Sequence, residues 1–538
     1  MNTRAGADVC RAALVRPERA TQRAEAVGGR RGRQRMRFKS TGIESPAGAG
    51  PMLNRLATSS AGVAALLSVS AALLMLNLGS RVFATNDEAR FPMLARDILA
   101  EGHWLLPRLD GVPHLNKPPL HAWLIALASW PMGAVTQWTA SVPSVFTALV
   151  VVLATYWMAR RLFGAETALV AGLMVLTTLG VFSFGRESMP DMTFCAATTT
   201  AMAAFIAFEV DGRRWALVLF YGLVGMALGT KGPAGLLPVA VVAAYCGITH
   251  GSAGLRRIIS APAVFVLALP IFLWAALVVG ASNAGPFVND VVIADLLQWY
   301  VPTGDWHWRR LAEPFLQALT ILLPWSVLLP GALWAAARPS VSASARGTRL
   351  SLVWLVVMFV LIAIGHQQRM RYYLPLCPPA VLLIAGWYAR LGARWRAVGF
   401  AAIWTLVVSG GIAVDAYARA RHNAATNLVP AVRELSQARR VYAVDAPELV
   451  FSFYLQRPVT VLASYRDFEA GVQHGQDGRL IIAERAVGPT LMRALPRLPA
   501  AIVGGRRFVI LSCGGTPIVA ADDCAGPEAS RRAWPTTP

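Results

Sequence analysis

Apolar segments long enough to cross a lipid bilayer recur through most of this 538-residue chain. A helix needs about 20 apolar residues to span a hydrocarbon core of about 30 Å, and the chain is 55% apolar and only 15% charged. We therefore predict an α-helical polytopic membrane protein with about 11–13 transmembrane helices. The segments expected to span are 61–78, 138–159, 165–184, 191–209, 215–230, 232–249, 261–280, 311–336, 350–365, 372–389 and 397–417.

The formal charge of +21 comes mostly from arginine, which raises the question of nucleic-acid binding. The arginines lie in the N-terminal tail and between apolar segments, where they act as topology signals, so no nucleic-acid partner is expected. Residues 1–53 are Arg-rich, poor in acids and without apolar periodicity, which predicts a disordered cytoplasmic tail. Translation from Met36 or Met52 is the alternative explanation of this tail.

The basic clusters between apolar segments predict the topology of the multi-pass domain, residues 54–417. With the N-terminus in the cytoplasm, all the clusters lie inside only if residues 118–136 do not cross the membrane. That segment opens with two prolines and is interrupted by Pro131, so we expect a re-entrant or interfacial helix. The clusters are Arg160-Arg161, Arg213-Arg214, Arg256-Arg257, then Arg338, Arg346 and Arg349, and finally Arg390, Arg394 and Arg396.

The first outer loop, residues 80–118, is the most polar stretch between apolar segments in the N-terminal half. Its charged residues are Asp87, Glu88, Arg90 and Lys117, among others. Charged groups at the edge of a bilayer are costly to keep, so the loop is expected to handle a polar substrate. Amphipathic spacing after Arg90, at Phe91, Leu94, Ala95, Ile98 and Leu99, predicts a short helix lying on the membrane surface.

Further polar stretches fall on the same predicted outer side. Carboxylates and cations from distant parts of the chain thus gather at one face, as an active site for a charged substrate requires. The stretches are 185–191, with Asp191; 230–233, with Lys231; 281–310, with His307; and 365–373, with Tyr372.

Four of these segments together resemble a known family. DEARFPMLARDILAEGHWLLPRLDGVPHLNKPPL is similar to the first outer loop of the C-type (GT-C) membrane glycosyltransferases, and RESMPDM, TKGPAGL and RYYLP resemble later family segments in the same order. The match is best with the branch of the lipid A aminoarabinose transferases (ArnT-like) and protein O-mannosyltransferases. It implies the GT-C fold and covers roughly residues 60–390.

The resemblance implies transfer of a sugar from a polyprenyl phosphate, usually undecaprenyl phosphate in bacteria. The acceptor is expected to be a lipid, glycan or protein, and the reaction to invert the anomeric centre on the periplasmic face of the inner membrane. No cofactor is expected, because the chain has neither a P-loop nor a dinucleotide fingerprint. A transporter or flippase of an anionic substrate is the alternative, although no internal repeat is evident.

The resemblance also implies roles for individual residues. Asp87 matches the catalytic aspartate, Asp191 the second carboxylate, and Glu88 is expected to help position the site. Cations beside a departing phosphate stabilise its developing charge, which suits Arg90 and Lys117, and Tyr372 matches a family tyrosine that hydrogen-bonds this phosphate. These six residues are the predicted site.

One residue departs from the family pattern. Lipid A aminoarabinose transferases carry Glu immediately before this Lys-Pro, where this chain has Asn116. That glutamate belongs to a metal site with a histidine of the large outer loop, and His307 matches the histidine poorly. We therefore expect no metal, and the difference weakens an assignment to aminoarabinose and lipid A.

The C-terminal part, residues 418–538, has a different composition. Short β-rich runs such as ARRVYAVD and RFVILSC alternate with the helical pattern ELVFSFYL. Such alternation predicts a small α/β domain, which the topology above locates in the periplasm.

The two cysteines of this domain, Cys513 and Cys524, are predicted to form a disulfide, because the periplasm is oxidising. Closing a loop of about a dozen residues stabilises a domain by roughly 2–3 kcal/mol in the chain-entropy model. Non-reducing peptide mapping of protein purified with a thiol-blocking reagent tests the bond. Blocking groups on both cysteines would contradict it.

Overall fold

A computed structural model describes most of the chain between Ser59 and Cys513, within one compact unit of residues 46–538. The predicted tail, Asn116, His307 and Cys524 lie outside the described residues, as does the side chain of Cys513. The described ranges are 59–115, 117–259, 261–282, 309–338, 345–365, 367–464, 467, 478–484, 501–503 and 506–513.

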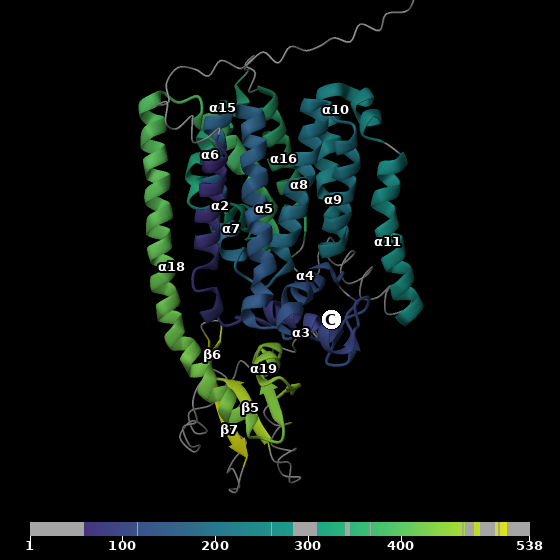
Figure 1. The fold of residues 1–538 in the computed structure, drawn as a ribbon, viewed down its shortest axis with the longest axis vertical. Coiled ribbons are helices and arrows are strands. Elements are labelled where there is room, and N and C mark those ends of the chain that lie inside the picture. Colours follow the sequence, from purple (N-terminus) through teal and green to yellow (C-terminus); the bar gives the residue numbers. More distant parts are fainter. Residues whose placement is uncertain are drawn as a thin grey trace, which may run out of the picture. The chain divides into compact units, whose positions relative to one another are not determined.

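The membrane domain is a bundle of apolar helices (Figure 1), which confirms the predicted fold class. Five helical segments of the described chain are long and apolar enough to span a bilayer, or six if one bent pair is a single span. The helices are α2 (Ser60–Met75), α5 (Gln137–Phe163), α6 (Ala165–Leu176), α7 (Leu179–Phe184), α8 (Pro190–Asp211), α9 (Trp215–Lys231), α10 (Leu237–Ile258), α11 (Ala261–Ser282), α14 (Arg309–Ile321), α15 (Leu329–Ala337), α16 (Ala345–Ala363), α17 (Cys377–Tyr388) and α18 (Ala393–Ser436).

Several predicted spans are interrupted in the structure. The span expected at 165–184 breaks between α6 and α7, and that at 311–336 bends by 109° between Ile321 and Trp325. The apolar stretch Trp215–Ile258 turns back through a short 3-10 segment, η3 (Gly232–Leu236), where Gly232 has a φ of 58°. Apolar composition therefore located the helices but not their breaks. The bend near Pro324 and the turn at Gly232-Pro233 follow from local prolines and glycines, whereas the break between α6 and α7 falls at Thr177-Thr178.

The basic clusters gather at one end of the bundle. Arg161 pairs with Asp211 at the end of α8, and Arg257 with Glu209 two residues earlier. Arg396, at the start of α18, pairs with Glu166 at the start of α6. These contacts join helix ends that all lie at the top of the bundle in Figure 1. The loops with the predicted site residues lie at the opposite end, which we call the site end.

Helix α3 (Asn86–Glu101) lies at the site end of the bundle. The Thr85 hydroxyl accepts a hydrogen bond from the Glu88 amide at 3.2 Å and caps the first turn. Gly102, with a φ of 73°, ends the helix and donates its N–H to the Ile98 carbonyl. Asp87 and Glu88 therefore lie in the first turn, where the helix dipole favours negative charge.

Helix α4 (Leu120–Ser129) runs beside α3 and stops at a 3-10 turn, η2 (Trp130–Met132), which contains Pro131. Ten residues rise only about 15 Å, half of a bilayer core. Helix α4 alone is thus too short to cross, as a re-entrant or interfacial helix would be.

The apolar face of α3 does not lie on lipid, contrary to the prediction. Phe91, Leu94 and Ile98 are buried in a core shared with α4 and with the C-terminal domain. The amphipathic pattern predicted the helix correctly, but such a pattern does not distinguish a protein partner from a membrane surface.

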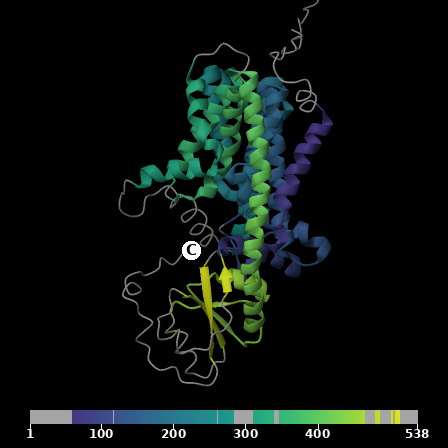
Figure 2. The same cartoon turned by 90° about the vertical axis from the view of Figure 1, so that its left-hand side faces the viewer.

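The C-terminal part contains a mixed five-stranded sheet in the order β4-β3-β5-β7-β6, consistent with the α/β domain predicted. Strands β3 (Val441–Val444), β4 (Thr460–Val461) and β5 (Gly478–Ala483) are parallel, whereas β6 (Ala501–Val503) and β7 (Arg506–Cys513) continue the sheet antiparallel. Helix α19 (Glu448–Leu455) connects β3 to β4 and packs on α3. Helix α18 runs from the bundle to the sheet (Figure 2), so residue 417 lies within it.

The segregation of the basic clusters predicts the sidedness of the two bundle ends. In a cysteine-free background, Arg161→Cys should be labelled by an impermeant maleimide only after the cells are opened, because basic ends remain in the cytoplasm. Pro233→Cys, in η3 at the site end, should be labelled in intact cells. Labelling of position 161 from outside would contradict this topology.

Candidate functional site

Asp87 lies at the centre of a cluster of arginines. Its Oδ2 atom is 2.7 Å from Arg371 Nη2 and 2.9 Å from Arg369 Nη1, and its Oδ1 atom is 3.2 Å from Arg90 Nη2. Arg90 is one helical turn away in α3, whereas the other two come from the start of the 3-10 helix η6 (Met370–Leu376) and the residue before it. The structure therefore joins two of the predicted outer stretches through this carboxylate.

The arginines determine the charge of Asp87. Partial burial acts to raise its pKa, but the hydrogen bond from Arg371 and the charges of Arg371, Arg90 and Arg369 outweigh burial, and the pKa is lowered. Asp87 is consequently ionised at neutral pH, and a carboxylate in this state is a weak base.

Asp191 and Lys231 form a second charged pair. Asp191, at the start of α8, is 2% exposed, and its Oδ1 atom is 2.5 Å from the Lys231 ammonium at the end of α9. The ammonium also lies 4.8 Å from the centre of the Tyr372 ring and 5.4 Å from that of Phe194. Aromatic faces stabilise a cation, so Tyr372 and Asp191 hold Lys231 between them.

Lys117 and Arg90 approach the same region from the first outer loop. Lys117 is partly buried just before α4, and its charge acts on both Lys231 and His114. Burial, together with Arg90 and Lys117, lowers the pKa of His114 to about 4. His114 is therefore neutral at neutral pH and adds no charge to this group of cations.

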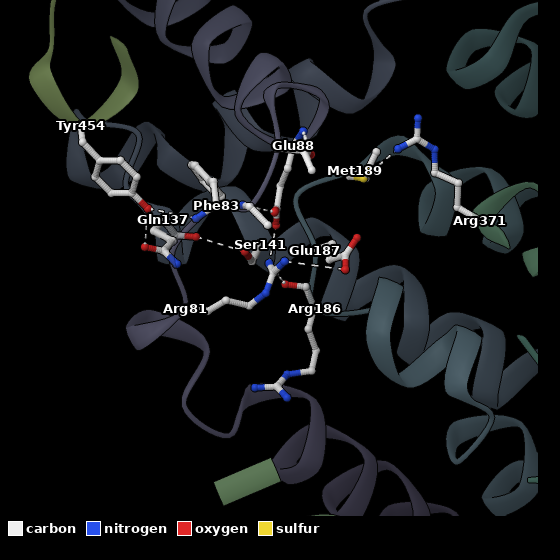
Figure 3. Close-up of polar contacts among 12 residues, drawn as sticks. Arg81, Phe83, Glu88, Gln137, Ser141, Arg186, Glu187, Met189, Arg371 and Tyr454 are labelled. Atoms are coloured by element: carbon white, nitrogen blue, oxygen red, sulfur yellow. Dashed lines mark hydrogen bonds and ion pairs between the residues drawn. The ribbon is translucent and has the colours of Figure 1, made fainter. Parts of the chain in front are cut away.

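Glu88, next to Asp87, faces a different set of residues (Figure 3). Its side chain is 2% exposed, forms a short ion pair with Arg81 and accepts a hydrogen bond from the Ala84 amide at 2.9 Å. Arg81 also donates to the Arg186 carbonyl at 3.2 Å and lies 3.7 Å from Glu187. Glu88 thus binds the loop before α3 to the loop before α8.

The six predicted site residues thus divide into two groups. One group lies around the arginines and Lys231 and comprises Asp87, Arg90, Asp191, Lys117 and Tyr372. Glu88 instead belongs to the contacts among Arg81, Glu88, Glu187 and the Arg186 carbonyl, which we call the Arg81 network. The sequence motifs assigned no role to Arg369, Arg371 or Lys231, although each lies in a predicted outer stretch. The excess of cations over carboxylates in those stretches was the available signal.

The described residues contain no group of three or more His, Cys, Asp or Glu side chains placed to hold a metal ion. Asn116 and His307, which carried the sequence comparison with the family metal site, lie outside the described residues.

Glu187 makes the Arg81 network sensitive to pH. Burial and the neighbouring Glu88 raise its pKa to about 7 despite the opposing charge of Arg81. The folded protein therefore holds a proton that the unfolded chain releases at lower pH, and stability falls as the pH rises from about 4.5 to about 7. Glu187→Gln should raise Tm relative to wild type more at pH 8 than at pH 5, by about 2 °C or more in detergent. A difference independent of pH would contradict this assignment.

The sequence is similar to a protein-family model and to known proteins. The family model described as dolichyl-phosphate-mannose-protein mannosyltransferase matches residues 116–278. A protein of Edwardsiella ictaluri named undecaprenyl phosphate-alpha-4-amino-4-deoxy-L-arabinose arabinosyl transferase is 30% identical over 358 residues, which cover 62% of this chain and 61% of that protein. A protein of the same name from Pectobacterium carotovorum is 28% identical, covering 62% and 60%. The chain thus spans about 60% of the length of these relatives.

The fold extends the likeness over more of the chain. The crystal structure of ArnT from Cupriavidus metallidurans bound to undecaprenyl phosphate covers 87% of this chain and all of its own, with a TM-score of 0.67 and 19% identity. The apo structure of the same protein gives a TM-score of 0.65. The resemblance to the C-type membrane glycosyltransferases is therefore confirmed by the sequence matches, which cover residues 116–278 in the family model and 62% of the chain in these relatives. The solved structures show the same fold over most of the chain.

Proposed function

We propose that this protein is an integral-membrane glycosyltransferase that transfers a sugar from a polyprenyl phosphate to a lipid acceptor. The reaction takes place on the periplasmic face of a bacterial inner membrane, with the N-terminus in the cytoplasm and the C-terminal domain in the periplasm. The curated relatives are named as arabinosyl transferases of an undecaprenyl phosphate donor, which supports a polyprenyl donor here.

One observation carries this proposal: cations outnumber carboxylates where the site loops meet. Arg90, Arg369 and Arg371 surround Asp87, and Lys231 is paired with Asp191. Lys117 adds a further positive charge close by. Such an excess at a membrane edge is costly unless an anionic ligand compensates it.

A polyprenyl phosphate supplies charge of the required size. The donor is a phosphodiester with one negative charge, and the phosphate that leaves carries about two at neutral pH. The cations therefore bind the departing group more strongly than the donor, which lowers the barrier to breaking its bond with the anomeric carbon. Arg90, Lys117 and Tyr372 are the proposed phosphate ligands, and Lys231 belongs with them.

Direct attack by an acceptor oxygen forms the new bond to the anomeric carbon as the phosphate leaves, and inverts the configuration. The lowered pKa of Asp87 favours an acceptor that needs no strong base, such as a lipid phosphate. Asp87 then orients the sugar or the acceptor, together with Asp191. A hydroxyl of a glycan or protein is the alternative acceptor, and Asn116 leaves the aminoarabinose and lipid A assignment open.

A transporter or flippase is not favoured. Transporters bind their substrates near the membrane midplane, where broken helices meet. The charged residues of the proposed site instead come from loops and helix ends at the site end of the bundle.

The donor role of the cations is testable by transfer of radiolabelled sugar from a polyprenyl-phosphate donor into membranes of a deletion strain. Lys117→Ala and Arg90→Ala should each lower transfer about 100-fold or more, because each removes a cation that stabilises the leaving phosphate. Asn116→Ala should be much milder. Mass spectrometry of the labelled lipids, glycans and envelope proteins identifies the acceptor.

Arg161→Ala is the matched control, since it removes an exposed cation from the opposite end of the bundle. It should retain wild-type transfer. Activity near that of wild type in Lys117→Ala would contradict the donor assignment, and equal losses in Lys117→Ala, Arg90→Ala and Asn116→Ala would indicate a purely structural loop.

A further inference from the structure

We propose that Asn86 is a positioning residue through which the C-terminal domain holds the catalytic turn of α3. Asn86 directly precedes Asp87 and is bound by Glu448 and Leu449 of α19, some 360 residues further along the chain. This inference rests on the proposed transferase function, because it assigns to the C-terminal domain a role in the placement of Asp87.

Asn86 makes two hydrogen bonds that use both ends of its amide. Its Nδ2 atom donates to Glu448 Oε2 at 2.7 Å, and its Oδ1 atom accepts from the Leu449 amide at 3.1 Å. A bond to an ionised acceptor is stronger than a neutral one, and the paired geometry fixes the orientation of the amide. We call this pair of contacts the Asn86 clamp.

The clamp supplies a helix cap that the sequence just before α19 does not provide. The residue before α19 is Pro447, whose side chain makes no capping hydrogen bond. A helix begins with unpaired N–H groups, and an Asn oxygen bonded to the second of them is a usual cap. Asn86 thus caps α19 from a distant part of the chain, so that the first turns of α3 and α19 are joined.

The clamp lies where small-molecule ligands bind in other open α/β domains, at the carboxyl end of a parallel strand. Ligands of open α/β sheets bind beyond the carboxyl ends of parallel strands, where the following helix begins. Strand β3 ends at Val444 and α19 begins at Glu448, and the group bound there is Asn86 of the membrane domain.

Other contacts hold the same interface without touching the Asp87 turn. The Tyr454 hydroxyl of α19 accepts a hydrogen bond from the Phe83 amide at 3.2 Å and donates one to Gln137 Oε1 of α5 at 2.9 Å (Figure 3). Arg96 donates to the Phe453 carbonyl at 2.9 Å, and its guanidinium lies 4.7 Å from the Phe453 ring. The domain therefore has separate contacts for docking and for the catalytic turn.

Asp87 is consequently held from two sides, by the bundle and by the C-terminal domain. Arg369 and Arg371 hold its carboxylate from the bundle, and the clamp holds the adjacent residue from the C-terminal domain. Release of the clamp removes the contact at Asn86, while Glu88 and the Thr85 cap still hold the same turn, so Asp87 can shift toward the arginines but the helix stays in place. A shift of about 1 Å in a catalytic group can cost a factor of 10² in rate, without a corresponding loss of substrate binding.

A reversal of the hydrogen-bond polarity tests the clamp. Asn86→Asp should lower kcat about tenfold, because it loses the donor and sets two carboxylates against each other, while KM for the donor changes less than about threefold. Glu448→Gln alone should lower kcat less than Asn86→Asp does, since the new amide oxygen still accepts from Asn86 through a weaker, neutral bond. The double variant, Asn86→Asp with Glu448→Gln, should recover most of the lost kcat, because the amide introduced at position 448 can donate to the carboxylate introduced at position 86.

Arg96→Met is the matched control, because it weakens docking nearly three turns further along α3. It should retain kcat within about twofold. Wild-type kcat in Asn86→Asp, failure of the double variant to recover, or an equal loss in Arg96→Met would each overturn the proposal. Failure to recover would mean that the negative charge introduced at position 86 itself disturbs the arginines around Asp87.

A second readout separates this inference from the proposed function. Hydrogen exchange of the amides of residues 86–90 should accelerate in Asn86→Asp and slow again in the double variant. If wild-type protein transferred no sugar but exchange followed this pattern, the clamp would stand and the transferase assignment would fail. Unchanged exchange in Asn86→Asp would refute the clamp whatever the activity.

Discussion

The structure depends on the mutual compensation of charge at the site end of the bundle. The Asp87 and Asp191 side chains lie at the site end, and each is held by cations from other segments of the chain. Neither side of these pairs is stable there alone, since an unpaired charge out of water costs several kcal/mol. The pairs therefore bring four stretches of sequence to one place, and their remaining positive charge determines which substrates fit.

The sequence predicted which segments form helices better than it predicted what those helices pack against. Apolar runs indicated the helices, and the short α4 is compatible with the expectation from the basic clusters that residues 118–136 do not cross. The face of α3 was assigned to lipid, because periodicity reports that a face is apolar and not what covers it. Its cover is a core formed with residues more than 300 positions away, which no local pattern encodes.

The site was foreseen as a set of residues, and its pairing was not. The motifs selected Asp87, Asp191, Arg90, Lys117 and Tyr372, but the partners of the two aspartates, Arg369, Arg371 and Lys231, depend on how helices end and loops meet. Asp87 and Glu88 illustrate the limit most clearly. They are adjacent in sequence, yet a helix turns by about 100° per residue, so one faces the arginines and the other the Arg81 network.

Helix α18 has a consequence for how this architecture can vary. It is one helix of 44 residues, about 66 Å long, that begins among the basic clusters and ends beside the sheet. A continuous helix transmits rotation as well as distance. One inserted residue would turn the sheet by about 100° and shift it by about 1.5 Å, carrying Glu448 away from Asn86. The number of residues in α18 therefore fixes how the sheet is rotated relative to the bundle, and only insertions or deletions near whole turns keep Glu448 close to Asn86.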